Sequence, residues 1–344
     1  MARSFRTAAV IGAAVLALAG CGGSTEVSRP VSGSWEDVVA AANDESAVTL
    51  YSTQAQPILA DLEKAFEAAY PSIDLTVVRG VDSDLLSRID AESRTGRGSG
   101  DVAVITDVPW MRAASDTDLA VEIIGPNFQA AEYRPDESID NGKFFLEGAV
   151  VLGFGWNTAL YPKGITTAQD LLDPALRGKV GIVTPATSPT YIDYYDHIEQ
   201  NYGGREFLQR LADNNPRIYP STQPLGQALA SGEITAALMS NPMLPERAAG
   251  APLDWTAGPK VWGAKWYGLA LGSAPHPNAA QVLANFMVSR EGQQVTSVGF
   301  GAALPDIEGS IAVAQDVGEQ NLEVTTGAGA EKYRSDWDQI FYKK

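Results

Sequence analysis

Short apolar segments alternate with amphipathic segments in the first third of the sequence, and this alternation limits the folds open to the chain. Residues 47–51, 73–78 and 101–105 are strand-length runs with apolar side chains on both faces. Between them, residues 58–70 and 82–93 repeat apolar side chains at helical spacing. A strand that is apolar on both faces needs helices on each side of its sheet, so we expect an α/β fold with a largely parallel sheet.

The rest of the sequence repeats this pattern. Further strands are expected at residues 149–156, 178–183, 234–239 and 265–271, with helices at 191–200, 204–214, 224–231 and 278–288. The 344 residues exceed one ordinary domain. We therefore expect two lobes of α/β structure.

The N-terminus has the layout of a secretory signal. Arg3 and Arg6 precede an apolar run at residues 8–19, which leads into Leu18-Ala19-Gly20-Cys21. That tetrapeptide resembles the lipobox of bacterial lipoproteins, which implies a signal peptide at residues 1–20 and a lipid on Cys21. Residues 21–45 are then a tether, rich in glycine and serine, followed by a short helix. The alternative is a plain secretory signal with an incidental cysteine.

Charge and cysteine content exclude several classes of function. The formal net charge of −17 argues against a nucleic-acid partner and against electrostatic adhesion to anionic lipid. Cys21 is the only cysteine, so the chain has no disulfide and no thiolate metal site. His197 and His276 are the only histidines and lie far apart in sequence, which disfavours a zinc site. We expect no cofactor and no resident metal.

Five stretches of the sequence carry a family resemblance: VTLYSTQ (48–54), DVAVITD (101–107), LGFGWNT (152–158), LASGEITAALM (229–239) and APHPNAAQVLANFMVSREGQQ (274–294). They resemble segments of the extracellular solute-binding proteins of bacterial ABC importers. The group in question includes ferric-, thiamine-, polyamine- and aminoethylphosphonate-binding receptors. The likeness is specific for the fold and for transport, and it does not name the solute.

The resemblance implies a two-lobed, type II periplasmic-binding-protein-like fold, in which two α/β lobes are joined by crossover strands. One lobe would comprise residues 46–150 and 270–344, and the other residues 151–269. The protein would be a non-catalytic, monomeric receptor that captures a small polar solute, expected to be an organic anion, and delivers it to an ABC permease. It would act outside the cytoplasm, lipid-anchored through Cys21 to the outer face of the bacterial cell membrane, or in the periplasm.

Candidate ligand-binding residues follow strands, because ligands of open α/β sheets lie beyond the carboxyl ends of the strands. The first three strands end in polar residues: Ser52, Thr53, Gln54, Arg79, Thr106 and Asp107. Arg79 can offer two parallel hydrogen bonds to a carboxylate or a phosphate. The competing interpretations are a solvated surface arginine and, for the hydroxyls and the carboxylate, capping of the next helix.

The second lobe and the crossovers contribute a further set of candidates. Ser188, Thr190 and Tyr191 lie at the start of a helix, where free N–H groups and the helix dipole favour an anion. Ser240 and Asn241 end another strand. Aromatic residues beside the predicted crossovers can wall the pocket or pack the hinge: Trp156, Trp266 and Tyr267.

Two alternative functions remain. Ferric-binding relatives use a tyrosine pair, and Tyr194-Tyr195 with His197 nearby offers one. This pair lies within a predicted helix, however, whereas the iron-binding pair of the family follows a strand whose counterpart here ends in Ser240-Asn241-Pro242. A secreted enzyme is the third hypothesis, and no Gly-x-Ser-x-Gly or His-Glu-x-x-His motif supports it.

Overall fold

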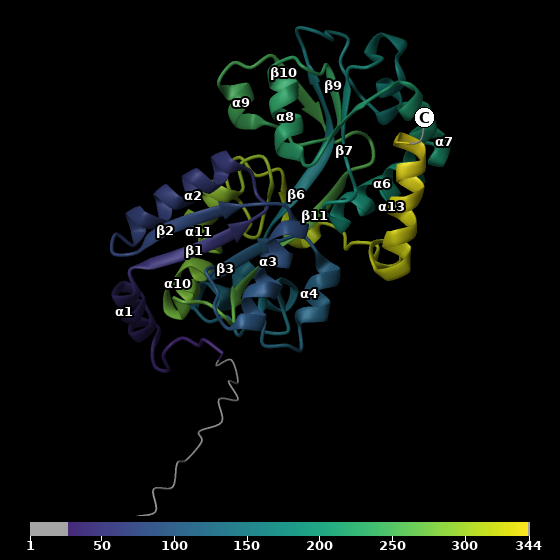
Figure 1. Cartoon of the computed structure of the whole chain (residues 1–344). Helices are drawn as coiled ribbons and strands as arrows, with labels where there is room; N and C mark the ends of the chain where they lie inside the picture. Colours follow the sequence, from purple (N-terminus) through teal and green to yellow (C-terminus); the bar gives the residue numbers. More distant parts are fainter. Residues whose placement is uncertain (1–26, 343–344) are drawn as a thin grey trace, which may run out of the picture.

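Two long strands, β6 (Phe144–Asn157) and β11 (Trp262–Leu271), connect the two lobes of the molecule (Figure 1). The computed structural model describes residues 27–342, so the expected signal peptide at 1–20 and the lipidation site Cys21 lie outside the described residues. The two crossover strands pair with each other in antiparallel fashion, and β6 continues from the sheet of the first lobe into that of the second. All 14 residues of β6 are buried.

The first lobe is built on the three strands predicted for the start of the chain, and they are parallel as expected. β1 (Ala47–Ser52) lies between β2 (Asp74–Arg79) and β3 (Val102–Ile105), and β3 pairs with β11. Side chains of β1 alternate between two cores because successive residues of a strand point to opposite faces. Leu50 belongs to a core shared with α2 (Gln56–Ala69), α10 (Pro277–Met287) and α11 (Arg290–Thr296). Tyr51 belongs to a second core, shared with α3 (Asp82–Thr95) and α4 (Val108–Ala114).

The second lobe has the strand order β6–β9–β7–β8. Its elements are β7 (Val180–Val183), β8 (Arg217–Tyr219), β9 (Ala236–Ser240), β10 (Leu253–Thr256), α6 (Pro189–Tyr202), α7 (Gly204–Asp213), α8 (Thr222–Ala230) and α9 (Leu244–Ala248). The remaining helices and strands are α1 (Trp35–Glu45), β4 (Ala120–Val121), α5 (Pro135–Ser138), β5 (Ile139–Asp140), β12 (Gly301–Ala302), β13 (Ala312–Val313), α12 (Leu322–Thr325) and α13 (Gly327–Phe341), with short 3₁₀ turns at 126–129, 131–133, 168–172, 174–176 and 314–316.

The C-terminal helix corrects one predicted boundary. Residues 270–344 were expected in the first lobe, but α13 packs against α6 and α7 of the second lobe (Figure 1). The ring of Trp337 lies 5.7 Å from that of Tyr195, and Arg205 Nη1 pairs with Asp336 Oδ2 at 3.0 Å. The apolar face of α6 therefore needs a segment that lies more than 100 residues further along the chain.

A buried carboxylate interrupts the first crossover strand. Glu147 lies at a bulge, because Trp266 pairs with Gly148 and Tyr267 with Leu146, which leaves Glu147 without an opposite residue. Its Oε2 accepts a hydrogen bond from Gln54 Nε2 at 2.9 Å. Burial raises the pKa of Glu147 from 4.5 to about 7, because a charged carboxylate loses its hydration inside the protein.

This buried carboxyl group makes stability depend on pH in a defined direction. Between pH 4.5 and about 7 the folded protein retains a proton that the unfolded chain has released, so the free energy of unfolding decreases as the pH rises through this window. The loss contributed by Glu147 amounts to about 3 kcal/mol. Glu147→Gln removes this contribution. Urea unfolding from about pH 4 to about pH 8 measures it, and a variant with the same pH slope as the parent would contradict the assignment.

Candidate functional site

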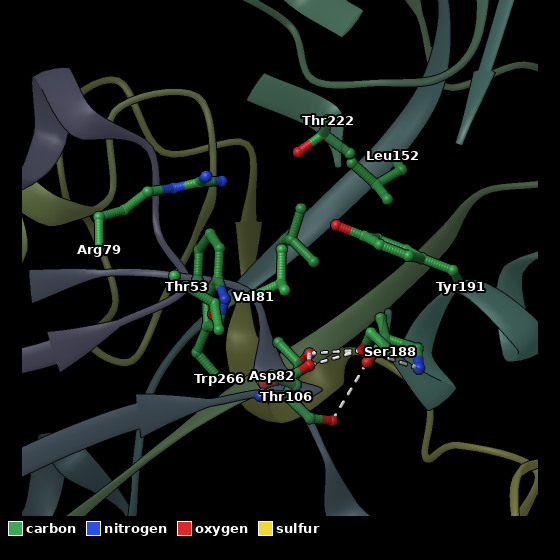
Figure 2. Close-up of a pocket in the computed structure, with 13 residues that line it drawn as sticks. Thr53, Arg79, Val81, Asp82, Thr106, Leu152, Ser188, Tyr191, Thr222 and Trp266 are labelled. Carbon is green, nitrogen blue, oxygen red and sulfur yellow. Dashed lines mark hydrogen bonds between the residues drawn. The ribbon is translucent and has the colours of Figure 1, made fainter. Parts of the chain in front are cut away.

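A hollow of about 430 Å³ lies where the two lobes meet (Figure 2). The first lobe contributes the ends of β1, β2 and β3, the second lobe contributes the starts of α6 and α8, and the crossover strands form the back wall. The lining residues are Thr53, Arg79, Gly80, Val81, Asp82, Thr106, Val150, Leu152, Ser188, Thr190, Tyr191, Thr222 and Trp266. From here on we call it the interlobe hollow.

Three helices begin at the interlobe hollow. They are α3, whose N-cap is Val81, α6, whose N-cap is Ser188, and α8, whose N-cap is Ser221. The N-caps of α3 and α8 provide no side-chain hydrogen bond to the first turn. Because the first N–H groups of a helix have no partner within the helix, the three N-termini together create a region of positive potential.

Asp82 forms the floor of the interlobe hollow and is not among the residues predicted from the sequence. Only 2% of its surface is exposed. Its Oδ2 accepts hydrogen bonds from Ser188 Oγ at 2.6 Å and from Thr106 Oγ1 at 2.7 Å, and its Oδ1 accepts one from the Thr106 N–H at 3.1 Å. Burial raises the pKa of Asp82, and these hydrogen bonds oppose that shift. Thr106 belongs to the first lobe and Ser188 to the second, so the carboxyl group joins the two lobes.

Further hydrogen bonds between the lobes surround this carboxyl group. Thr190 Oγ1 donates to the Thr106 carbonyl at 3.1 Å. Gln320 Nε2 donates to the same carbonyl at 2.7 Å and to Thr190 Oγ1 at 3.0 Å. The described conformation is therefore one in which the lobes are closed on each other at the base of the hollow.

Arg79 extends over the interlobe hollow from the end of β2, and Tyr191 extends toward it from the opposite side (Figure 2). The guanidinium makes only long hydrogen bonds, from Nε to the Gln54 carbonyl at 3.4 Å and from Nη2 to Ser221 Oγ at 3.5 Å. Within residues 27–342 no carboxylate forms an ion pair with it. Burial lowers the pKa of Arg79, because a cation that loses its hydration is less stable than the neutral form.

Half of the predicted site residues meet at the interlobe hollow. These are Thr53, Arg79, Thr106, Ser188, Thr190, Tyr191 and Trp266. They come from three strand ends, from the start of α6 and from the second crossover. The fold therefore brings together predicted residues that are up to 213 positions apart in the sequence, from Thr53 to Trp266.

The other predicted residues do not line the interlobe hollow. Ser52 and Gln54 bond to each other, and Gln54 also reaches Glu147. Asp107 caps α4 by accepting from the Trp110 N–H at 2.9 Å. Trp156 and Tyr267 pack in the core, and Ser240 bonds to the neighbouring Asn241 carbonyl. Asn241 is a lining residue of a neighbouring cavity.

Residues of the interlobe hollow that sequence reasoning missed include Asp82 and Thr222. Both occupy the first position of a helix that follows a strand. The sequence signal for both residues is a polar side chain at the start of a helix that follows a strand. Asp82 also lies three residues after Arg79. The other missed residues are backbone or apolar wall: Gly80, Val81, Val150 and Leu152.

The Tyr194-Tyr195 pair is part of the core rather than of the hollow. Tyr195 is fully buried and donates to the Val183 carbonyl at 2.7 Å, and the Tyr194 ring packs edge-on to Trp262 at 5.0 Å. Burial raises the pKa of both phenols, which disfavours the phenolate that iron requires. Among residues 27–342, no group of three or more histidine, cysteine, aspartate or glutamate side chains is arranged to hold a metal ion.

No helix in the described part of the chain has both the length and the apolar composition needed to cross a membrane.

Comparisons with known proteins agree with this architecture. A family described as bacterial extracellular solute-binding protein matches residues 48–298. A comparison with curated protein sequences finds no significant match. Among solved structures, the substrate-binding protein of an ABC transporter from Agrobacterium tumefaciens superposes with a TM-score of 0.75 at 13% identity, covering 86% of this chain and 94% of that one.

Two further structures have known ligands. AfuA from Actinobacillus pleuropneumoniae, with fructose-6-phosphate bound, has a TM-score of 0.71 at 17% identity and covers 87% of this chain and 99% of its own. Iron-bound HitA from Pseudomonas aeruginosa has a TM-score of 0.62 at 20% identity and covers 86% and 99%. Such low identities carry the fold and not the ligand. The predicted two-lobed, type II periplasmic-binding-protein fold is confirmed.

The hydroxyl of Ser188 is expected to stabilise the closed arrangement measurably. Ser188→Ala removes one donor from the buried Asp82 carboxyl group and the side-chain cap of α6, so we expect a loss of about 1–3 kcal/mol in the free energy of unfolding. Thr187→Ala is the matched control, because its exposed hydroxyl donates only to the Pro220 carbonyl at 2.9 Å. Equal urea midpoints for the two variants would refute the role assigned to Ser188.

Proposed function

The chain belongs to the family of bacterial extracellular solute-binding proteins, and we propose that it is the receptor of an ABC importer for a small organic solute that carries an oxyanion. The observation that carries this proposal is the unpaired Arg79 guanidinium over the N-termini of α3, α6 and α8. An oxyanion in the interlobe hollow would accept bidentate hydrogen bonds from Arg79. It would also lie in the positive field of three helices.

The remaining side chains of the interlobe hollow support an anion over a cation. The hydroxyl groups of Thr53, Tyr191 and Thr222 can donate to a solute. Those of Thr106, Ser188 and Thr190 already donate within the floor of the hollow. Asp82 is the one carboxylate in the lining, and both of its oxygens already accept hydrogen bonds from Thr106 and Ser188. A cationic solute or a ferric ion would therefore meet Arg79 without a free carboxylate to balance it.

Capture is proposed to work through closure of the lobes. Arg79 belongs to the first lobe, and Ser188, Tyr191 and Thr222 belong to the second, so a solute between them contacts both. Such a solute stabilises the closed state and shifts the population toward it. The crossover strands β6 and β11 would bend as the lobes open, and the closed form would be the one that the permease recognises.

The family places the protein outside the cytoplasm. We propose that a lipid on Cys21 holds it, as a monomer, at the outer face of the membrane beside its permease. A single tethered receptor stays at high local concentration near the importer.

A solute screen tests the proposed ligand class. Phosphate, alkyl phosphates, dicarboxylates, sugar phosphates, neutral sugars, polyamines and ferric salts are added to purified protein, and the thermal unfolding midpoint is recorded. We expect oxyanion-bearing organic compounds to raise the midpoint. A response to ferric salts together with visible absorption, and none to any anion, would replace this proposal with the ferric alternative. Turnover of a bound compound by the purified protein would favour the enzyme hypothesis.

Arg79→Ala is expected to weaken binding of the best anion from that screen by about tenfold to a hundredfold, because one charge-assisted bidentate contact is lost. Titration calorimetry measures the change. Arg97→Ala is the matched control, since Arg97 belongs to the same lobe and is exposed. Unchanged affinity in the Arg79 variant would remove the arginine from the site.

Cys21→Ser tests the proposed anchor. We expect the substitution to move the protein from the membrane fraction to the soluble secreted fraction, because a lipid chain supplies about 0.8 kcal/mol of membrane affinity per buried methylene. Cell fractionation followed by mass spectrometry of the N-terminal peptide reports both location and lipid. A parent protein that is already soluble and unmodified would support the plain secretory signal instead.

A further inference from the structure

A second cavity continues the cleft beyond the interlobe hollow. It measures about 550 Å³ and lies between the start of α2 in the first lobe and α8 with the β9–α9 loop in the second. Its lining residues are Ala55, Pro57, Thr222, Gln223, Gly226, Gln227, Ala230, Asn241, Met243 and Glu246. Thr222 lines both cavities, so the two are neighbours along the same interface between the lobes. We call this second cavity the acceptor pocket, after the hydrogen-bond acceptors of its lining residues.

Two residues that line the acceptor pocket, Gln223 and Asn241, each have an amide oxygen without a hydrogen-bond partner among the described residues. Gln223 Oε1 and Asn241 Oδ1 are both inaccessible to solvent and unpartnered in the part of the chain that the structure describes. A buried polar atom without a partner is destabilising, and a donor placed beside it would satisfy it. Carbonyl oxygens accept and do not donate. These two side chains therefore favour a ligand group that carries N–H or O–H.

The charge in the acceptor pocket is opposite to that in the interlobe hollow. No lysine, arginine or histidine lines it, and Glu246 is its one charged lining residue. The neighbouring Arg247 pairs with Asp254 at 2.7 Å instead. Ala55, Pro57 and Met243 add apolar surface that suits a carbon chain.

The backbone around Asn241 is held in an unusual conformation. Met239 has φ 69° and Met243 has φ 49°, so two residues other than glycine adopt the left-handed region on either side of Asn241. Met239 is in β9 and Met243 is the N-cap of α9. Such conformations are strained and cluster at ligand sites.

We propose that the acceptor pocket is a second subsite, which selects solutes whose far end carries hydroxyl or amino donors. The inference rests on the proposed function, because the oxyanion held by Arg79 fixes the other end of the solute. The substrate class is then an elongated organic oxyanion, with a phosphate, phosphonate or carboxylate at one end and hydrogen-bond donors at the other.

The test uses alkyl phosphates of increasing chain length, each in three forms: plain, with a terminal hydroxyl and with a terminal amine. Inorganic phosphate serves as the probe of the interlobe hollow alone. Titration calorimetry on the full folded protein is expected to show a gain of about tenfold to a hundredfold for the donor-bearing forms over the plain form at the length that reaches Asn241. Equal affinity for all three forms at every length would overturn the subsite.

Variants locate the gain. Asn241→Ala and, as an independent second variant, Gln223→Leu are expected to abolish the advantage of the donor-bearing forms and to leave phosphate affinity unchanged. Asn201→Ala, on an exposed face of α6, is the control. A parallel loss for phosphate and for every alkyl phosphate would also overturn the subsite, because it would indicate general damage to the cleft.

Glu246→Gln separates the two kinds of donor. A solute with an ammonium group loses its charge partner, so the terminal amine loses affinity and the terminal hydroxyl does not; the reverse pattern would contradict an acceptor role for Glu246. Failure of every phosphate and every carboxylate of the solute screen to bind would overturn the proposed function itself. Binding of phosphate through Arg79 without any donor advantage would overturn the subsite alone.

Discussion

The Asp82 carboxyl group is the contact on which the geometry of the cleft depends. It is buried beneath the interlobe hollow and receives hydrogen bonds from Thr106 of one lobe and Ser188 of the other. A buried carboxyl group without donors is costly. Thr106 supplies two donors from the same lobe, and the third, from Ser188, is present only when the lobes meet. The floor of the hollow is consequently assembled from both lobes and does not exist in either one alone.

The same contact determines how the nearby positive charge can be used. Both oxygens of Asp82 accept hydrogen bonds from Thr106 and Ser188, and Asp82 forms no ion pair with Arg79. Arg79 thus keeps its charge in a partly desolvated position, where an electrostatic interaction is stronger than in water. Three helix N-termini add to the same field. The hollow combines a hydrogen-bonded carboxyl group in its floor with an unpaired guanidinium over its opening.

Local signals and distant contacts differ in how well the sequence reveals them. Strand ends are local features of the sequence. Hydrophobic periodicity, together with the polar residues that bound each strand or helix, could therefore predict β1, β2 and β3 and the positions of Arg79, Thr106 and Ser188. The position of α13 could not, because its partners on α6 lie more than 100 residues away. The same holds for Asp82, whose role depends on a serine 106 positions further along the chain. Likewise, the bulge at Glu147 arises only where β6 meets β11.

The second lobe depends on the C-terminal helix α13, which returns to pack against α6 and α7. The chain passes between the lobes along β6, along β11 and again on the way to α13. Trp337 of α13 covers Tyr195, so residues 151–269 on their own would present that aromatic surface to water. The second lobe is therefore not a detachable unit, because release of α13 by proteolysis between α11 and α13 would expose the aromatic core of that lobe.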